Sequence, residues 1–304
     1  MKFALFSVSY AGLWGQATLS LEDFLRKAKS LGYDGVELMG KRPHLSPLDV
    51  TEERADALAR LARELGLEVA CVAAYTNFTA GLESLEVPLV DIQVQYVESL
   101  ARLAARLGCR LIRVFTGYER PALPEGLDLQ RGWQYGKLWA MCIEGIRACC
   151  DRAAPLSVTI GIQNHHDIAV HTDAFLELIA DIDRPNCKAM FDAWSPALRG
   201  EDLYAAAKKA APFTVYTTAA DYITLPRYRY QPDLVNYLPT DPPLVRAVPF
   251  GEGIIDYPAF FRGLRDGGYD GWVAYEMCSP LRGGGSLDNL DSCARQFLAR
   301  MRTA

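Results

Sequence analysis

Polar side chains that could do chemistry follow several strongly apolar runs of this 304-residue chain. Asp192 comes directly after the apolar run 189–191, and Glu276 comes directly after the apolar run 273–275. A carboxylate at the end of a buried run is costly unless it meets a cation or strong hydrogen bonds. Further polar groups of the same kind stand at or near the ends of other apolar runs: Glu37, Arg113, Gln163, His165 and Thr218.

The chain has four histidines, and three of them, His165, His166 and His171, lie close together after one apolar run. Residues two apart on a strand share a face, so Gln163 and His165 are predicted to point the same way, and Asn164 the opposite way. His165 is a candidate ligand or base, and an ordinary core or surface histidine is an equal alternative. His166 and His171 are predicted to be loop residues.

Two acids and a histidine from neighbouring strands are typical of a hard-metal site with mixed oxygen and nitrogen ligands. The alternative is structural, because each acid could pair with an arginine such as Arg113 or Arg282, or cap a nearby helix. We favour the site interpretation for Asp192 and Glu276, since acids that intrude at the end of buried strands are more often functional.

The elements that must position these residues alternate between apolar runs and amphipathic helical patterns. Such alternation predicts a parallel sheet with helical crossovers, and eight pairs favour a single closed (β/α)8 barrel with its active site at the carboxyl ends of the strands. A doubly wound sheet is the second choice, but the segment 10–15 lacks the GxGxxG spacing of a dinucleotide site. The predicted strands are 2–9, 33–38, 67–74, 109–115, 157–163, 187–191, 214–219 and 271–277.

Helix signals support this division of the chain. Ser20, with Asp23 three residues later, is predicted to cap the first helix, and Thr51 to cap the second. The other predicted helices cover about 90–108, 132–154, 172–182, 201–211, 256–264 and 286–302.

One segment, at about 221–253, interrupts the alternation of strands and helices after the seventh strand. It is rich in aromatic residues, prolines and arginines, and it is too long for an ordinary connection. We therefore expect residues 1–304 to form one domain with a long loop insertion here. Such a loop could wall the active site, or it could be a packed surface excursion or a subunit contact, so a homo-oligomer stays open.

Composition excludes several classes of function. A net charge of -5 without long like-charge blocks is unsuited to nucleic acid. The eight cysteines form no CxxC pair, which favours buried thiols in a reducing cytoplasm. The apolar start of the chain is too short for a signal peptide, and no run approaches the roughly 20 apolar residues of a membrane span.

In the order and spacing of several short segments, the sequence resembles the xylose isomerase-like barrel family of sugar isomerases and epimerases. The resemblance covers nearly the whole chain. It rests on the segments 31–38, 113–117, 163–165, 191–192, 251–257 and 268–276.

The resemblance implies one divalent metal ion, Mn, Mg, Co or Zn, held by a glutamate, an aspartate, a histidine and a glutamate after strands five to eight. Asp192 and Glu276 match two of these positions, whereas Gln163 and Thr218 stand where the first glutamate and the histidine are expected. Metal affinity should therefore fall, so that the metal is held weakly or is absent. With His165 as a nearby donor, the candidate ligands are Gln163, His165, Asp192 and Glu276.

The same departures bear on mechanism. In the family's epimerases two metal-bound glutamates act as acid and base, but Gln163 cannot take a proton. Either His165 supplies the missing base, or the chemistry is one-sided, as in an elimination. The related apurinic endonucleases need a histidine-rich cluster, which four histidines cannot supply, so nuclease activity is not expected.

The expected function is thus an isomerase or epimerase of a small sugar, keto-sugar or cyclitol. Glu276 would transfer a proton beside a carbonyl, with His165 as the second candidate catalytic group, and Asp192 would anchor the metal. The alternatives are a lyase or hydrolase of an oxidised glycoside, and a non-catalytic sugar-binding subunit. The residues expected to bind substrate are Glu37, Arg113, Thr218, Trp14 and Trp194.

Overall fold

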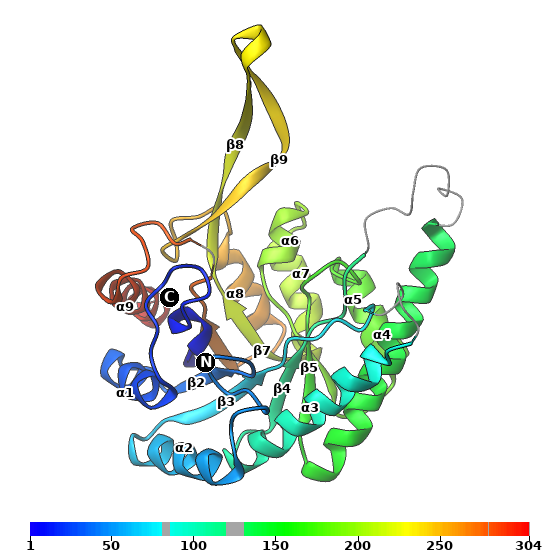
Figure 1. Ribbon diagram of the computed structural model, residues 1–304, viewed down its shortest axis with the longest axis vertical. Helices are drawn as coiled ribbons and strands as arrows, with labels where there is room; N and C mark the ends of the chain where they lie inside the picture. The colour runs from blue at the N-terminus through cyan, green and yellow to red at the C-terminus, as the bar shows by residue number, and fades with distance from the viewer. Residues whose placement is uncertain (81–85, 120–130, 279, 304) are drawn as a thin grey trace.

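Eight parallel strands close into a barrel in the computed structural model, which describes residues 1–80, 86–119, 131–278 and 280–303 (Figure 1). The last strand of the barrel pairs with both the first and the seventh, which closes the ring. The predicted (β/α)8 barrel is therefore confirmed. Its strands are β1 (Lys2–Phe6), β2 (Gly35–Met39), β3 (Glu68–Ala73), β4 (Leu111–Val114), β5 (Thr159–Gln163), β6 (Cys187–Met190), β7 (Thr214–Ala219) and β10 (Trp272–Tyr275).

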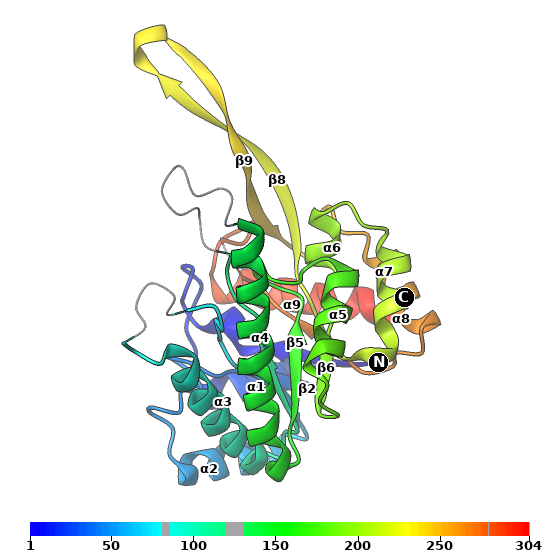
Figure 2. The ribbon, with the colours of Figure 1, turned by 90° about the vertical axis from the view of Figure 1, so that its right-hand side faces the viewer.

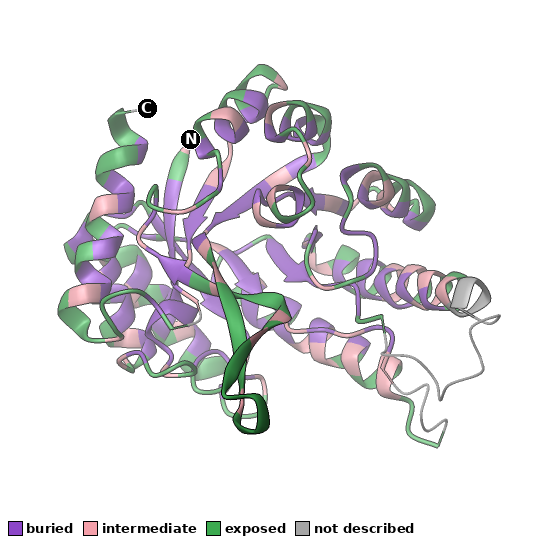
Figure 3. Cartoon of the chain, turned by 90° about the horizontal axis from the view of Figure 1, so that it is seen from above, coloured by how far each residue is buried: buried purple, intermediate pink, exposed green. Residues whose placement is uncertain are grey.

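Helices surround the strands, as the view from above shows (Figure 3). Each buries an apolar stripe against the barrel and exposes its charged face. The short α6 (Trp194–Leu198) is an addition that the sequence patterns did not predict. The outer helices are α1 (Leu21–Leu31), α2 (Glu52–Glu64), α3 (Leu89–Arg106), α4 (Arg131–Ala153), α5 (Thr172–Ile182), α7 (Leu203–Ala210), α8 (Tyr257–Asp266) and α9 (Leu287–Thr303).

The barrel interior is sealed by an apolar floor. Its members come from six different strands and pack together as one buried cluster. A glycine at position 161 leaves room for this packing, because a Cβ there would come within 2.7 Å of the Met190 side chain. The floor consists of Ala4, Cys71, Leu111, Met190, Tyr216 and Ala274.

The insertion after β7 is a β-hairpin, not the loop that the sequence analysis predicted. Its strands, β8 (Asp221–Gln231) and β9 (Asn236–Val248), pair antiparallel and project from the barrel (Figures 1 and 2). Prolines hid this strand pattern in the sequence, but a two-stranded ribbon has free edges on which proline is tolerated. Apolar side chains near the turn are exposed, including Val235 at 77% and Tyr237 at 64%.

The expectation of buried cysteine thiols is largely met in the described structure. All eight cysteines are free thiols, and every one except the half-buried Cys278 is buried. The search of the described residues found no helix with the length and apolar character needed to cross a bilayer.

The first helix begins as predicted, because the Ser20 hydroxyl accepts a hydrogen bond from the Asp23 N–H at 3.1 Å. We predict that Ser20→Ala lowers the free energy of unfolding by about 1 kcal/mol, since it leaves a helix N–H without its cap. Urea unfolding would measure this. Ser30→Ala, at the exposed far end of α1, is the matched control and should change stability by less than about 0.5 kcal/mol. Equal losses in both variants would contradict the capping role.

Candidate active site

A polar layer lies directly above the apolar floor, at the carboxyl ends of the strands. Side chains two positions beyond the floor residues point in the same direction, into the barrel. All but one of these polar side chains are more than 90% buried, and Glu276 is half-buried. We call this set the mouth layer: Glu37, Arg113, Gln163, Asp192, Thr218 and Glu276.

Arg113 is the cation of the mouth layer. Its Nη1 lies 3.3 Å from Oε1 of Glu37, and both side chains are buried. The guanidinium is also surrounded by the rings of Phe6, Tyr75 and Phe115, whose centroids lie 4.9, 5.3 and 4.6 Å from Cζ. These rings stabilise a desolvated cation. No sequence pattern had singled out Phe6, which lies within β1, or Tyr75, which follows β3.

Asp192 is held by hydrogen bonds to both carboxylate oxygens. Gln163 donates from Nε2 to Oδ2, and the Thr218 N–H donates to Oδ1 at 2.7 Å. Thr217 adds a longer bond from Oγ1 to Oδ1 at 3.4 Å. The carboxylate therefore bridges the ends of β5 and β7 across the end of β6.

Asn164 is a positioning residue that the sequence analysis missed. It binds the backbone after β6. Its Oδ1 accepts the Asp192 N–H at 2.7 Å, and its Nδ2 donates to the Asp192 carbonyl at 3.0 Å. Its own carbonyl accepts a bond from Ser195 Oγ at 2.6 Å. Only its place beside Gln163 could have drawn attention to it.

The three carboxyl groups of the mouth layer are electrostatically coupled. Burial raises the pKa of Glu37 to about 8 and that of Asp192 to about 7, and it also raises the pKa of Glu276. Glu276 adds to the shift at both other acids, while Arg113 lowers all three pKa values. Carboxyls poised near neutral pH can both accept and return a proton.

His165 lies at the rim, outside this network. Its Nδ1 accepts the backbone N–H of His166 at 2.7 Å, and its ring centroid lies 5.2 Å from that of Phe115. Partial desolvation by the surrounding protein and repulsion by Arg113 lower the pKa of this exposed ring. The ring is neutral at pH 7. No side-chain hydrogen bond joins it to Asp192 or Glu276 in the described structure.

The two tryptophans expected to cover a sugar have partners outside the mouth layer. Trp14 is 39% exposed, and its backbone N–H donates to Oε1 of Gln16 at 2.6 Å. Trp194 begins α6, and its ring centroid lies 4.0 Å from that of Tyr222. Neither ring has an aromatic or hydrogen-bond contact with the mouth layer among the described residues.

The donor atoms at the mouth fit an oxygen-only metal site. No three histidine, cysteine, aspartate or glutamate residues of the described chain gather closely enough to bind a metal, so His165, Asp192 and Glu276 do not form such a cluster. However, Gln163 Oε1 and Thr218 Oγ1 are buried without hydrogen-bond partners beside Asp192. Amide, hydroxyl and carboxylate oxygens suit Mg²⁺ or Mn²⁺ better than Zn²⁺.

The raised pKa of Asp192 predicts that the free energy of unfolding falls as the pH rises. Because the folded-state pKa of about 7 exceeds the ordinary value of 3.8, the folded state holds the proton more tightly, and stability is lost as pH rises through this window. Between pH 5 and 7, wild type should lose about 2 kcal/mol relative to Asp192→Asn, which cannot ionise. Urea unfolding of both proteins at each pH measures the difference. Parallel pH curves for the two proteins would refute the shift.

Comparisons with known proteins show the family to which the chain belongs. The family model described as "xylose isomerase-like TIM barrel" matches residues 25–296. L-ribulose-5-phosphate 3-epimerase UlaE of Shigella flexneri is 22% identical over 274 residues, which are 88% of this chain and 86% of the relative.

Solved structures agree on the fold. The probable 3-DHS dehydratase AsbF of Bacillus anthracis superposes with a TM-score of 0.71 at 19% identity and covers 99% of each chain. The 3-keto-D-glucoside 4-epimerase YcjR of E. coli superposes with a TM-score of 0.71 at 16% identity over 100% of each chain. On the match of the family model, the protein belongs to the xylose isomerase-like TIM barrel family.

Proposed function

We propose that the protein is an isomerase or epimerase that moves a proton beside the carbonyl of a small sugar, keto-sugar or cyclitol. The observation that carries this proposal is the mouth layer, where three coupled carboxyl groups with raised pKa values face one buried guanidinium. The relatives named as a ribulose-phosphate epimerase and a keto-glucoside epimerase support the class of substrate.

Glu276 is the proposed proton carrier. Of the mouth-layer acids it is the least buried, and its side chain has no ion-pair partner in the described structure. Glu37 is paired with Arg113, and Asp192 is held at both oxygens. Glu276 takes the proton from the carbon next to the carbonyl, the C–H electrons form the C=C bond of an enediolate, and the carbonyl π electrons move to oxygen. Protonated Glu276 then returns a proton to the neighbouring carbon in an isomerisation, or solvent supplies it from the opposite face in an epimerisation.

The remaining residues position the substrate and compensate its charge. Arg113, with Glu37 and Thr218, is proposed to bind substrate oxygens, and the exposed Trp14 and the half-buried Trp194 would border the entrance. His165 is the proposed second catalytic group at the rim, where its neutral imidazole, with Nδ1 accepting the His166 N–H, would donate its Nε2–H to a substrate oxygen. A bound Mg²⁺ or Mn²⁺ would stabilise negative charge on the carbonyl oxygen. Asp192, Glu276, Gln163 and Thr218 are the residues that would hold it.

The proposal predicts exchange of one substrate proton with solvent. Purified protein with added Mn²⁺ should incorporate deuterium from heavy water into at least one member of a panel of ketoses and keto-glycosides. Glu276→Gln should lower the exchange rate by about a hundredfold or more, because the amide cannot take a proton. Glu64→Gln, on the exposed face of α2, is the matched control. Full exchange in the Glu276→Gln variant would overturn the assignment.

A lyase acting on an oxidised glycoside is the second candidate. It is favoured by Gln163, which leaves one face of the site without the usual second glutamate. The structural likeness to a protein named as a probable dehydratase is compatible with it. Mass spectrometry separates the candidates, since an epimer keeps the mass of the substrate whereas an elimination product loses the mass of the leaving group.

The donor set predicts weak metal binding that two substitutions should strengthen. Gln163→Glu with Thr218→His supplies a carboxylate and an imidazole beside Asp192, so Mn²⁺ affinity should rise at least tenfold, equivalent to about 1.4 kcal/mol. Isothermal titration of wild type and the double variant measures the change. Equal Mn²⁺ affinity would mean that Gln163 and Thr218 do not border a metal position.

A further inference from the structure

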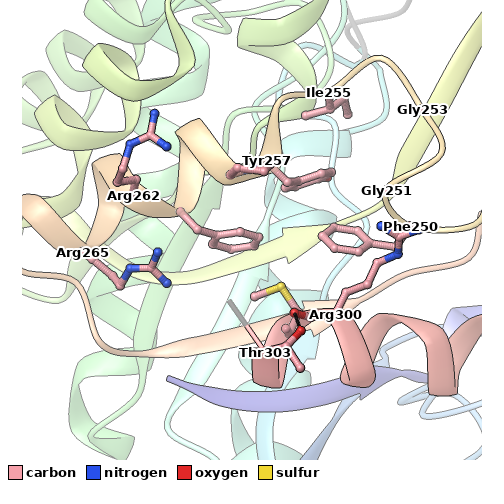
Figure 4. Close-up of a pocket in the computed structure, with 12 residues that line it drawn as sticks. Phe250, Gly251, Gly253, Ile255, Tyr257, Arg262, Arg265, Arg300 and Thr303 are labelled. Atoms are coloured by element: carbon pink, nitrogen blue, oxygen red, sulfur yellow. Dashed lines mark hydrogen bonds between the residues drawn. The ribbon is translucent and has the colours of Figure 1, made fainter.

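A groove of about 460 Å³ lies in the outer layer between α8 and α9, away from the mouth layer (Figure 4). Its volume is in the range of small-molecule sites. None of its lining residues belongs to the mouth layer, so it is a separate feature. The lining residues combine aromatic rings with arginines, and they come from α8, α9 and the segment that joins β9 to α8.

Three arginines border the groove from two sides. Arg262 and Arg265 are one helical turn apart on α8, and Arg300 reaches in from α9 (Figure 4). Arg262 also lies over the ring of Tyr204, with Cζ 5.7 Å from its centroid. No carboxylate of the described residues forms an ion pair with any of the three.

The backbone of the groove is shaped to hold Arg300. Gly251 has a φ of +82°, and a Cβ there would lie 2.7 Å from Nη1 of Arg300, so only glycine lets the guanidinium lie against this turn. Asp221 fixes the turn by accepting the N–H groups of Gly251 and Gly253 at 2.8 and 2.9 Å. This anchoring keeps the Arg300 side of the groove in a defined position.

The remaining wall is apolar and largely aromatic. Phe250 and Tyr257 are buried with ring centroids 4.6 Å apart, and Phe261 packs against Tyr257 at 5.5 Å. The Tyr257 hydroxyl is already used, because it donates to the Ala220 carbonyl at 2.6 Å. These packed rings therefore give the groove an apolar wall that offers no further polar contact.

We propose that this groove binds a small phosphate monoester whose organic part is flat and apolar. The guanidinium groups of Arg265 and Arg300 line the groove, and a guanidinium binds phosphate oxygens through paired, charge-assisted hydrogen bonds. The aromatic wall accepts the organic part. The site is independent of the proposed chemistry at the mouth, and nothing in the proposed function requires it.

Phenyl phosphate is the test ligand for the full-length protein, with isothermal titration at low ionic strength as the measurement. We expect saturable binding that is at least tenfold weaker in an Arg265→Gln/Arg300→Gln variant. Arg60→Gln removes an exposed arginine of α2 outside the groove and should leave the affinity unchanged. Inorganic phosphate should bind more weakly than phenyl phosphate, and phenol should not bind.

Three results would overturn the proposal. Absence of saturable binding, or equal binding by the double arginine variant, would show that the groove is not an anion site. Equal affinity for inorganic phosphate would remove the role of the aromatic wall. Loss of binding in Glu276→Gln would place the ligand at the mouth, whereas retained binding supports the groove whether or not the protein catalyses proton transfer.

Discussion

The electrostatic balance inside the barrel depends on one buried guanidinium. Arg113 is the single lysine or arginine among the buried residues of the described chain, and it faces three carboxyl groups of the mouth layer. Removing four charges from water would be prohibitive without mutual compensation. Here one ion pair and several hydrogen bonds offset part of that free energy, and the raised pKa values let a carboxyl group be neutral. Carboxyl groups with such pKa values are suited to proton transfer.

The geometry of parallel strands explains why these groups meet. Inward-facing side chains recur every second residue, so a polar residue two positions beyond an apolar one lies directly above it. Arg113 stands above Leu111, and Thr218 stands above Tyr216. The apolar floor excludes water from below, which strengthens the interactions of the layer above it. The same arrangement leaves Glu276 nearest to solvent, where a substrate can reach it.

Much of the architecture followed from local patterns, while the contacts of the site did not. Helical spacing and caps such as Ser20 predicted the elements, because they depend on residues close in sequence. The partners of Arg113 could not be predicted, since Glu37 lies on β2 and Tyr75 follows β3, both distant from Arg113 in sequence. The hairpin after β7 was wrongly expected to be a loop, because prolines obscure strand periodicity in an edge ribbon.

Gln163 contacts Asp192 differently from a glutamate at the same position. A glutamate at this position would repel Asp192 unless a cation lay between them, whereas the glutamine amide donates a hydrogen bond to the same carboxylate. The Thr218 N–H satisfies the other oxygen. Protein donors thus hold both oxygens of Asp192 in place without a cation between them. In the function we propose, this leaves the proton transfer to Glu276.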